Sequence, residues 1–224
     1  MISVLVPIYN EKEVLSERSA MFQNIAKVAE LLFVDGGSTD KSEDIAARYG
    51  RIITSEKGRA RQMNAGAREA SGDILSFLHA DNIVSPETIN SIEKAVRENE
   101  VIGGCLTQRI ESERPVFRFI EWQGNNRARR TKIFYGDQGI FVRKDVFDQL
   151  GGFPDVPIFE DVLFSQKLKQ AGKTTVLPDK IRVSARRWEK RGIFKTTLMF
   201  NKLLIMFKLG HPLEKIKRLY EDLR

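Results

Sequence analysis

The sequence has very little cysteine and histidine. Cys105 is the single cysteine, and His79 and His211 are the only histidines. One cysteine excludes an internal disulfide, and three such residues are too few for a structural zinc site of the Cys/His type. We therefore expect a chain that folds in a reducing compartment, with the cytoplasm as the default, and we expect Cys105 to be a buried strand thiol.

The common phosphate-binding loops are also missing. No G-x-G-x-x-G follows the first predicted strand, and no G-x-x-x-x-G-K-[ST] occurs anywhere in the chain. These absences exclude the dinucleotide fingerprint and the P-loop. The first ten residues lack a basic leader, and Pro7 and Asn10 interrupt their apolar run, so we expect no signal peptide.

Acidic charge is scarce at the end of the chain. Residues 186–224 contain 11 Lys or Arg and 4 Asp or Glu, whereas residues 1–185 contain 26 of each, so the net charge of +7 belongs to the tail. A shorter basic cluster lies at 127–132. Basic tails favour anionic surfaces, either membrane or nucleic acid. The balanced charge of residues 1–185 argues against nucleic acid as the main partner.

Length and hydrophobic patterning predict one large α/β domain. With 224 residues, 42% of them apolar, the chain can bury a core of that size. Predicted strands lie at 2–8, 31–34, 51–54, 73–78, 101–110, 140–143, 174–177 and 181–184. Predicted helices lie at 13–30, 40–49, 60–70, 86–99, 111–132, 144–150 and 160–171. Early strands that alternate with helices indicate a parallel, wound sheet. We place the domain at 1–190 and a basic amphipathic appendage at 191–224, where two helices are broken at 210–212.

Polar side chains follow the predicted strands at their carboxyl ends. Open parallel sheets bind ligands at that edge, and there the sequence places Tyr9, Glu11, Asp35, Asp81 and Asn82. Tyr9 can stack on a base, and Asp35 can accept hydrogen bonds from a base or a ribose. Asp81 ends the apolar run that begins at residue 74, where a carboxylate can hold a hard cation such as Mg²⁺ or Mn²⁺.

Six segments, taken in order, resemble a family 2 glycosyltransferase of the GT-A type. They are VPIYNE (6–11), VDGGSTD (34–40), GRARQMNAG (58–66), HAD (79–81), FED (159–161) and RRW (186–188). The resemblance covers about residues 2–190. It implies a Rossmann-like wound mixed sheet flanked by helices, with the C-terminal helices as an appendage. It also implies an inverting, metal-dependent hexosyltransferase that uses a UDP-sugar and a hydroxyl acceptor, which is a saccharide, a lipid-linked group or a small molecule.

The resemblance assigns the donor site residue by residue. Pro7, Tyr9, Glu11 and Asp35 would form the uridine pocket, with Arg59 and Asn64 towards the ribose and phosphates. Asp81 matches the last acid of the family's D-x-D motif, but His79 stands where the first acid is expected. One carboxylate would then hold Mg²⁺ or Mn²⁺, and phosphate and water would supply the other ligands.

The catalytic positions follow in the second half of the chain. Asp161 matches the family's general base, and Glu160 would orient the acceptor or cap the helix. Arg187 and Trp188 match the end of Q-x-x-R-W, although its glutamine is replaced by Ser184. The guanidinium would stabilise the diphosphate, and the indole would pack against the acceptor. Asp137 and Gln138, in a loop flanked by glycines, are candidates for sugar or acceptor hydroxyls.

Each assignment has a plainer alternative. Tyr9 can be a strand-end aromatic, Asp35 a helix cap and Asp81 a turn carboxylate. Either acid at 160–161 can serve the helix dipole, Arg187 can belong to a solvated charge run, and His79 can be structural.

Other functions and other roles for the tail also stay open. The rival enzyme is a nucleotidyltransferase, although its Gly-rich, Lys- or Arg-containing loop after the first strand is absent. The rival non-enzyme is a membrane-surface or nucleotide-binding module. Residues 194–209 carry three lysines in 16 residues, which suits a helix in the membrane interface, peripheral at the inner face. The alternative is a helix packed on the domain or against a second subunit of a homodimer.

Overall fold

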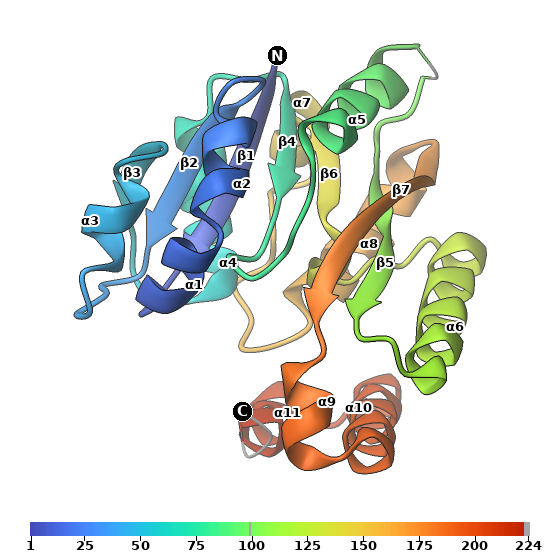
Figure 1. Ribbon diagram of the computed structural model, residues 1–224. Coiled ribbons are helices and arrows are strands. Elements are labelled where there is room, and N and C mark those ends of the chain that lie inside the picture. The colour runs from blue at the N-terminus through green and yellow to red at the C-terminus, as the bar shows by residue number, and fades with distance from the viewer. Residues whose placement is uncertain (99, 222–224) are drawn as a thin grey trace.

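A mixed β-sheet forms the centre of the molecule (Figure 1). The computed structural model describes residues 1–98 and 100–221, and within them the strand order is β3-β2-β1-β4-β6-β5-β7. The strands are β1 (Ile2–Ile8), β2 (Glu30–Asp35), β3 (Arg51–Thr54), β4 (Ile74–Phe77), β5 (Gly103–Glu111), β6 (Ile140–Arg143) and β7 (Thr174–Ser184). The first four are parallel, and β6 runs antiparallel to β4 and β5. The predicted wound, mixed sheet is therefore confirmed.

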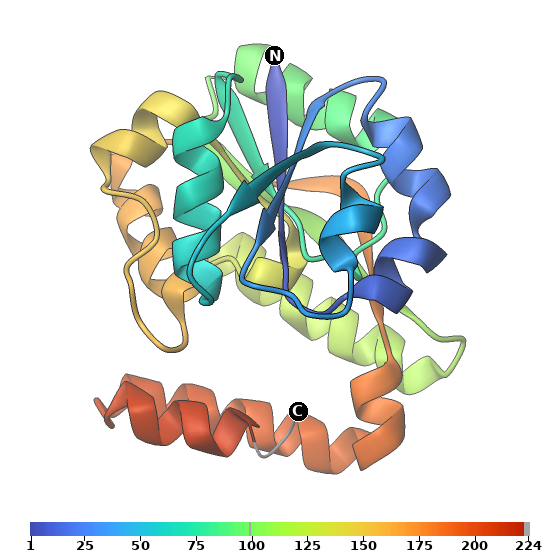
Figure 2. The same cartoon turned by 90° about the vertical axis from the view of Figure 1, so that its left-hand side faces the viewer.

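Helices cover both faces of this sheet (Figures 1 and 2). The first face is covered by α1 (Lys12–Glu17), α2 (Ser19–Ile25) and α5 (Pro86–Glu98), with α3 (Ser42–Ala46) beside them. The second face is covered by α4 (Arg59–Glu69), α7 (Lys144–Gln149) and α8 (Glu160–Ala171). The remaining helices are α6 (Pro115–Thr131), the 3₁₀ turn η1 (Gly136–Gln138), α9 (Arg186–Arg191), α10 (Ile193–Lys208) and α11 (Leu213–Glu221).

Alternate residues of β1 reach two separate core layers. Val4 and Val6 pack with α1, α2 and α5, whereas Leu5 packs with α4, α7 and α8. This is why the strand reads as a continuous apolar run. Gly66 lets α4 approach closely, because a Cβ there would lie 2.6 Å from Leu5 and 2.8 Å from Val34.

The structure corrects several predicted boundaries. The helix expected at 13–30 is two helices that meet at Arg18, whose guanidinium pairs with Glu111 at 3.2 Å. The two strands expected at 174–177 and 181–184 are one strand, because β5 pairs with both segments through an irregular register between Cys105 and Thr107. Because β5 extends to Glu111, α6 begins only at Pro115, and α9 was not predicted. The predicted helix ends at Asn99 and Arg224 lie outside the described residues.

The parallel strands direct their carboxyl ends towards the C-terminal helices, at the bottom of Figure 1. Leu203, Met206 and Ile216 of these helices are buried together and pack against Ile158 and Phe159, directly before α8. Helices α9 to α11 therefore lie over the edge of the sheet where a ligand is expected. The boundary between residues 190 and 191 stays an interpretation.

Candidate active site

The loops after β1 and β2 are joined by hydrogen bonds. The Asn10 side-chain oxygen accepts from the Thr39 N–H at 2.8 Å, and the Asn10 N–H donates to the Ser38 hydroxyl at 2.9 Å. One residue further, the Glu11 N–H donates to the Ser42 hydroxyl at 2.8 Å. These bonds hold together the loops after β1 and β2, which we call the floor of the predicted uridine pocket.

Asp35 and Tyr9 lie at this floor in different surroundings. Asp35 is buried, and its carboxylate accepts from the backbone N–H groups of Gly37 and Ser38, each at 2.9 Å. It therefore orders the loop after β2. At the start of α3 it is Asp40, not Asp35, whose carboxylate accepts from a helix N–H, that of Ser42 at 3.0 Å. The Tyr9 ring is 37% exposed, and the Lys57 ammonium lies 3.7 Å from its centroid, a cation–π contact.

Pro7 and Glu11 lie on either side of Tyr9, in and just after β1. Pro7 is half-buried in β1, in register with Val34, and Glu11 is half-buried at the start of α1. Neither position conflicts with the predicted roles. The nucleotide contacts of Pro7, Tyr9, Glu11 and Asp35 stay predictions.

Gln62 is a positioning residue that the sequence analysis missed. Its side-chain amide is buried and donates to the carbonyls of Ile8 and Val34, each at 2.8 Å. It thus ties together the last residues of β1 and β2, directly beneath the predicted base site. Its signal in the sequence is a glutamine on the apolar face of the predicted helix at 60–70.

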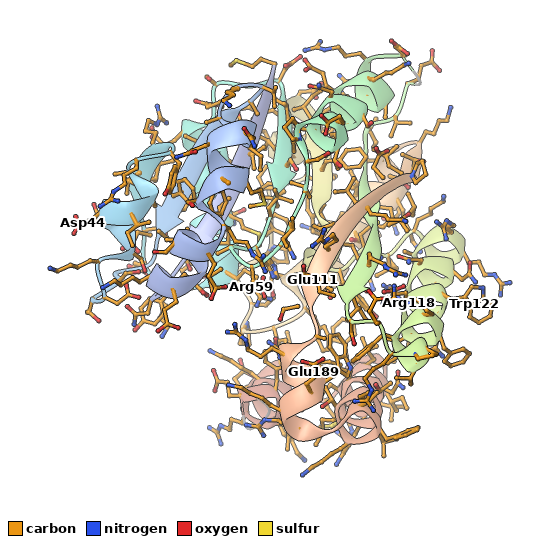
Figure 3. The ribbon with its side chains drawn as sticks, viewed as in Figure 1. Asp44, Arg59, Glu111, Arg118, Trp122 and Glu189 are labelled. Carbon is orange, nitrogen blue, oxygen red and sulfur yellow. The ribbon has the colours of Figure 1, made fainter. Side chains whose placement is uncertain are left out.

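Arg59 and Asn64 leave the same helix in different directions. Arg59 lies on the side of the domain that faces the C-terminal helices (Figure 3), and its guanidinium is 3.4 Å from the Glu160 carboxylate. Burial disfavours the charge of Arg59, but Glu160, Tyr220 and Asp161 more than offset this and raise its pKa. The Asn64 side-chain amide instead donates to the Phe153 carbonyl at 2.7 Å, and its oxygen accepts from the Phe153 N–H at 2.9 Å. This geometry favours a positioning role for Asn64 over direct contact with ribose and phosphates.

The turn after β4 presents Asp81 to solvent. The Asn82 side-chain oxygen accepts from the His79 N–H at 2.8 Å, and the Asn82 N–H donates to the His79 carbonyl at 3.0 Å. Buried Asn82 therefore closes the turn, and exposed Asp81 projects from it. Within the described part of the chain no group of three or more metal-ligating side chains occurs. A single exposed carboxylate fits a metal held mainly by substrate phosphates and water.

Asp161 lies close to the turn after β4, with Gly136 of η1 between them. Its carboxylate accepts from the Gly136 N–H at 2.6 Å and from the Val162 N–H at 2.7 Å. A Cβ on Gly136 would lie 2.9 Å from the His79 Nε2 and 3.5 Å from the Asp161 carboxylate. Glycine at this position lets η1 pass between the two side chains without displacing the His79 ring. The predicted base therefore lies next to the turn that carries Asp81.

Asp137 and Gln138 are held inside the same loop. The Gln108 amide donates to one Asp137 oxygen at 2.7 Å, and the other oxygen is buried without a hydrogen-bond partner among the described residues. Gln138 is almost fully buried, and its oxygen accepts from Arg127 and from the Tyr135 N–H, both at 3.1 Å. Gln138 thus serves the loop itself. The unpartnered oxygen keeps Asp137 as a candidate for a ligand hydroxyl.

Burial dominates the electrostatics of the acidic residues. It raises the pKa of Asp137, with a further increase from Asp161 and, more weakly, from Asp81. It also raises the pKa values of Glu160 and Asp161, although Arg59 opposes the increase at both. Three carboxyl groups with raised pKa values in one place suit a site that takes up protons and binds cationic groups.

Glu160 and Asp161 begin α8 after an unusual backbone turn. Phe159 has a left-handed conformation with φ of 67°, which is rare for a bulky residue. Its ring packs against Phe207 of α10, with 4.7 Å between centroids. The C-terminal helices thus support the conformation that directs both acids into the site.

Arg187 and Trp188 lie on α9, between the sheet edge and α10. The Trp188 ring packs edge-on against Phe117 and Phe200, each 5.9 Å away between centroids. These contacts make Trp188 a packing residue between α6 and α10, and its contact with an acceptor stays a prediction. The Arg187 guanidinium donates to the Tyr220 hydroxyl at 2.9 Å.

Comparison with known sequences identifies the relatives of this chain. The profile described as Glycosyl transferase family 2 matches residues 3–151. The undecaprenyl-phosphate 4-deoxy-4-formamido-L-arabinose transferase of Pectobacterium carotovorum is 31% identical over 125 residues. That match covers 50% of this chain and 38% of the relative, so the chain corresponds to well under half of the relative's length.

Comparison with solved structures shows the fold. The mannosyltransferase PcManGT of Pyrobaculum calidifontis, solved with GDP-Man and Mn²⁺, has a TM-score of 0.68 at 21% identity and covers 99% of this chain and 69% of its own. S. aureus TarS 1–349, solved with UDP-GlcNAc, has a TM-score of 0.63 at 19% identity and covers 82% and 58%. These likenesses confirm the predicted GT-A fold.

Proposed function

The chain belongs to glycosyltransferase family 2, and on that premise we propose that it transfers a hexosyl group from a UDP-sugar to a hydroxyl acceptor with inversion. The observation that carries this proposal is the convergence of three carboxylates at one sheet edge: one is buried, one is exposed and one is half-buried. They are Asp35 of β2, Asp81 of the β4 turn and Asp161 of α8. One solved neighbour was obtained with UDP-GlcNAc, which supports a nucleotide-sugar donor.

Asp161 is the residue best placed to act as general base. In an inverting displacement it removes the proton of the acceptor hydroxyl while the oxygen attacks the anomeric carbon and the bond to UDP breaks. Its two backbone N–H bonds, from Gly136 and Val162, fix the carboxylate for that attack. Glu160 is committed to Arg59 at 3.4 Å, which suits a residue that orients rather than reacts.

The leaving diphosphate carries the electron pair of the broken bond. Arg59 of α4 and Arg187 of α9 are the two guanidinium groups that we propose to stabilise this charge. When bound at Asp81, Mg²⁺ or Mn²⁺ would neutralise part of the diphosphate charge. The acceptor stays unidentified, although the undecaprenyl-phosphate named in the relative supports a lipid-linked one.

Calorimetry with UDP tests this function. We expect UDP to bind in the presence of Mn²⁺ and to bind at least tenfold more weakly in EDTA. Asp81 alone offers the metal few ligands, so the metal and the diphosphate should bind together and each should strengthen the binding of the other. Hydrolysis of UDP-sugars, measured as released UDP, then identifies the donor. Release of pyrophosphate from a nucleoside triphosphate and a sugar phosphate would instead identify a nucleotidyltransferase. No affinity for UDP would remove the UDP-sugar proposal.

We also propose that an exposed face of α6 and α10 binds an anionic bilayer. No helix in the described residues is long and apolar enough to cross a membrane. Phe194, Leu198 and Ile205 of α10, and Leu209 directly after it, are 56–86% exposed and recur at helical spacing. Other residues of α10, among them Leu203 and Met206, pack on the domain, so one face of the helix is buried while the other is exposed.

Helix α6 extends the same surface. Its Phe119 and Trp122 rings are each 61% exposed and stack at 5.9 Å, and Figure 3 shows Trp122 directed away from the molecule. A groove lined by Val116, Ile193 and Phe194 joins the starts of α6 and α10. The two helices therefore offer aromatic and aliphatic side chains next to each other.

The positive charge of this face favours an anionic bilayer over a second copy of the chain as its partner. Residues 193–208 contain Lys195, Lys202 and Lys208 and no acidic residue, and the only acid of α6, Glu121, is buried. A second copy of the chain would bring like charges together, whereas anionic headgroups attract each lysine by about 1 kcal/mol. The cytoplasmic location and the peripheral attachment to the inner face stay predictions.

Vesicle co-sedimentation tests the surface. We expect binding to vesicles that contain phosphatidylglycerol, little binding to phosphatidylcholine alone, and loss of binding in high salt. Lys202→Glu and Leu198→Gln should each weaken binding, whereas Lys94→Glu, an exposed lysine on α5, should not. Equal binding by all three variants would refute the assignment. Concentration-dependent dimers that the Leu198→Gln change disrupts would instead identify a second copy.

A further inference from the structure

Helix α8 begins without a polar cap. Its N-cap residue is Phe159, which offers no side-chain hydrogen bond to the helix and has a left-handed backbone with φ of 67°. Ser, Thr, Asp or Asn in an extended conformation usually fills this position. A left-handed conformation is costly for a bulky residue and persists only where the surrounding structure holds it. The start of α8, which carries Glu160 and Asp161, therefore depends on packing.

Side chains of the C-terminal helices supply that packing. The centroid of the Phe159 ring lies 4.7 Å from that of Phe207 of α10, with 47° between the two ring planes. Ile158 and Phe159 pack against one apolar cluster, which contains buried Leu203 and Met206. Figures 1 and 2 show the segment before α8 reaching from the domain towards α10 and α11. The contact between the two rings thus joins α10 to the start of α8.

The segment that leads to Phe159 has few other fixed points. Phe153 is buried, and its backbone N–H and carbonyl both bond to the Asn64 side chain. None of residues 154–158 is buried. The ion pair between this segment and α4 is exposed, and such pairs contribute little to stability. The Phe159 ring is therefore the main anchor directly before Glu160.

The position of the predicted base follows from that anchor. The Asp161 carboxylate accepts from the Gly136 N–H at 2.6 Å and from the Val162 N–H at 2.7 Å. The first of these bonds joins α8 to η1, so a shift of the start of α8 moves the carboxylate away from η1. Displacing a catalytic group by about 1 Å can lower a rate by about 10². Packing at Phe159 is thereby linked to the rate of the reaction.

We propose that Phe207 is a positioning residue for the catalytic base. Its ring holds Phe159 in the left-handed conformation and so keeps Asp161 in place beside the acceptor oxygen. The proposal rests on the proposed function, because it takes Asp161 as the general base. Helix α10 then serves catalysis through packing, in addition to any role at a membrane surface.

Phe207→Ala removes the ring contact, and donor hydrolysis measures the effect because water then takes the place of the acceptor. We expect kcat for UDP release to fall at least about tenfold. The affinity for UDP should stay within about twofold, because the predicted uridine pocket is built from the loops after β1 and β2. Phe207→Leu keeps an apolar side chain and should recover most of the loss. Asn201→Ala, at an exposed position of the same helix, is the control and should change neither quantity.

Two further measurements separate positioning from general stability. In the Asp161→Asn background, Phe207→Ala should lower kcat no further, because the base is already absent. Amide hydrogen exchange needs no turnover and reports on the carboxylate directly. Exchange at Gly136 and Val162, whose N–H groups bond to Asp161, should become about tenfold faster in Phe207→Ala. Exchange in β2 should stay as in the wild type.

Each other outcome decides against a part of this account. A kcat of Phe207→Ala within about twofold of the wild type would overturn the proposal. Equal losses of kcat and UDP affinity, or equally faster exchange in β2, would also overturn it, because they indicate a general loosening of the fold. Additive losses in the double variant would place the effect of the ring elsewhere. If the wild type releases UDP from no UDP-sugar, the proposed donor is wrong, and hydrogen exchange alone decides whether Phe207 fixes the carboxylate.

Discussion

Replacing Asp161 with asparagine tests the predicted catalytic centre most directly. A positioned general base contributes a factor of about 10² to 10⁴ in rate, equivalent to about 3–5 kcal/mol of barrier. We therefore expect kcat of Asp161→Asn to fall by at least about 10². The affinity for UDP should stay within about twofold, because among residues 1–98 and 100–221 the hydrogen bonds of the Asp161 carboxylate go to the backbone of Gly136 and Val162.

Two opposing changes keep this variant folded. The asparagine oxygen can accept only one of the two backbone N–H bonds, a loss of about 1 kcal/mol. It also removes a half-buried carboxyl group whose pKa is raised by desolvation. We expect a shift in the thermal midpoint of only a few degrees. Asp145→Asn, an exposed carboxylate of α7 that pairs with Arg143, is the matched control for both activity and stability.

The pH dependence supplies a second measurement on the same variant. The folded-state pKa of Asp161 lies above its ordinary value of 3.8, so the folded protein binds more protons than the unfolded chain above that pH. The stability contributed by Asp161 therefore falls as pH rises from 3.8 through the raised pKa, and the thermal midpoint of Asp161→Asn should gain on the wild type over that window. The acid limb of wild-type kcat/KM should lie above pH 3.8.

The assay is release of UDP from the donor found in the hydrolysis screen, with and without acceptor. Turnover of Asp161→Asn within about threefold of the wild type would remove Asp161 from the mechanism, since base catalysis supplies far more than that. Loss of UDP binding in this variant would indicate that the change has disturbed the donor site rather than the base.

Four further predictions follow from the same contacts. Asp81→Asn should weaken UDP binding in Mn²⁺ at least tenfold by calorimetry and leave the affinity in EDTA unchanged; equal losses in both would exclude a metal role. Gln62→Leu leaves two strand-end carbonyls without their donor, and denaturant titration should show a loss of about 2–3 kcal/mol in the free energy of unfolding. Gly66→Ala should cost about 1–3 kcal/mol in the same titration, because the added methyl group meets β1 and β2. The pKa of the Cys105 thiol is raised by burial, so a thiol reagent should modify it only after unfolding.

The part of the fold that the sequence predicts is the part governed by short-range patterns. Continuous apolar runs mark β1, β2 and β4 because these strands are buried on both faces. Polar residues directly after such runs mark the ligand edge, which is why Asp35 and Asp81 were found. The break at Arg18 was missed because Arg18 pairs with Glu111, which lies 93 residues away.

Residue types alone did not separate groups that face the site from groups that support it. Asn64 and Gln138 carry the polar amides expected of a sugar site, yet both spend them on the loop backbone or on Arg127. Gln62 has the same chemistry and fixes the floor of the pocket. Which amide faces a ligand depends on the path of the backbone around it, and a linear pattern does not contain that path.

The tail shows the same limit at the scale of a whole segment. Its basic charge and apolar spacing predicted a surface helix, and the boundary at residue 190 followed from that change in composition. In the structure one side of α10 packs against Phe159, next to the predicted catalytic acids Glu160 and Asp161, while Leu198 and Lys202 are exposed. If α10 binds a bilayer, attachment and donor binding involve adjoining segments, because Phe207 of α10 packs on Phe159, directly before Glu160 and Asp161. Vesicles that raise the UDP affinity of the wild type, but not that of Lys202→Glu, would show that the two are coupled.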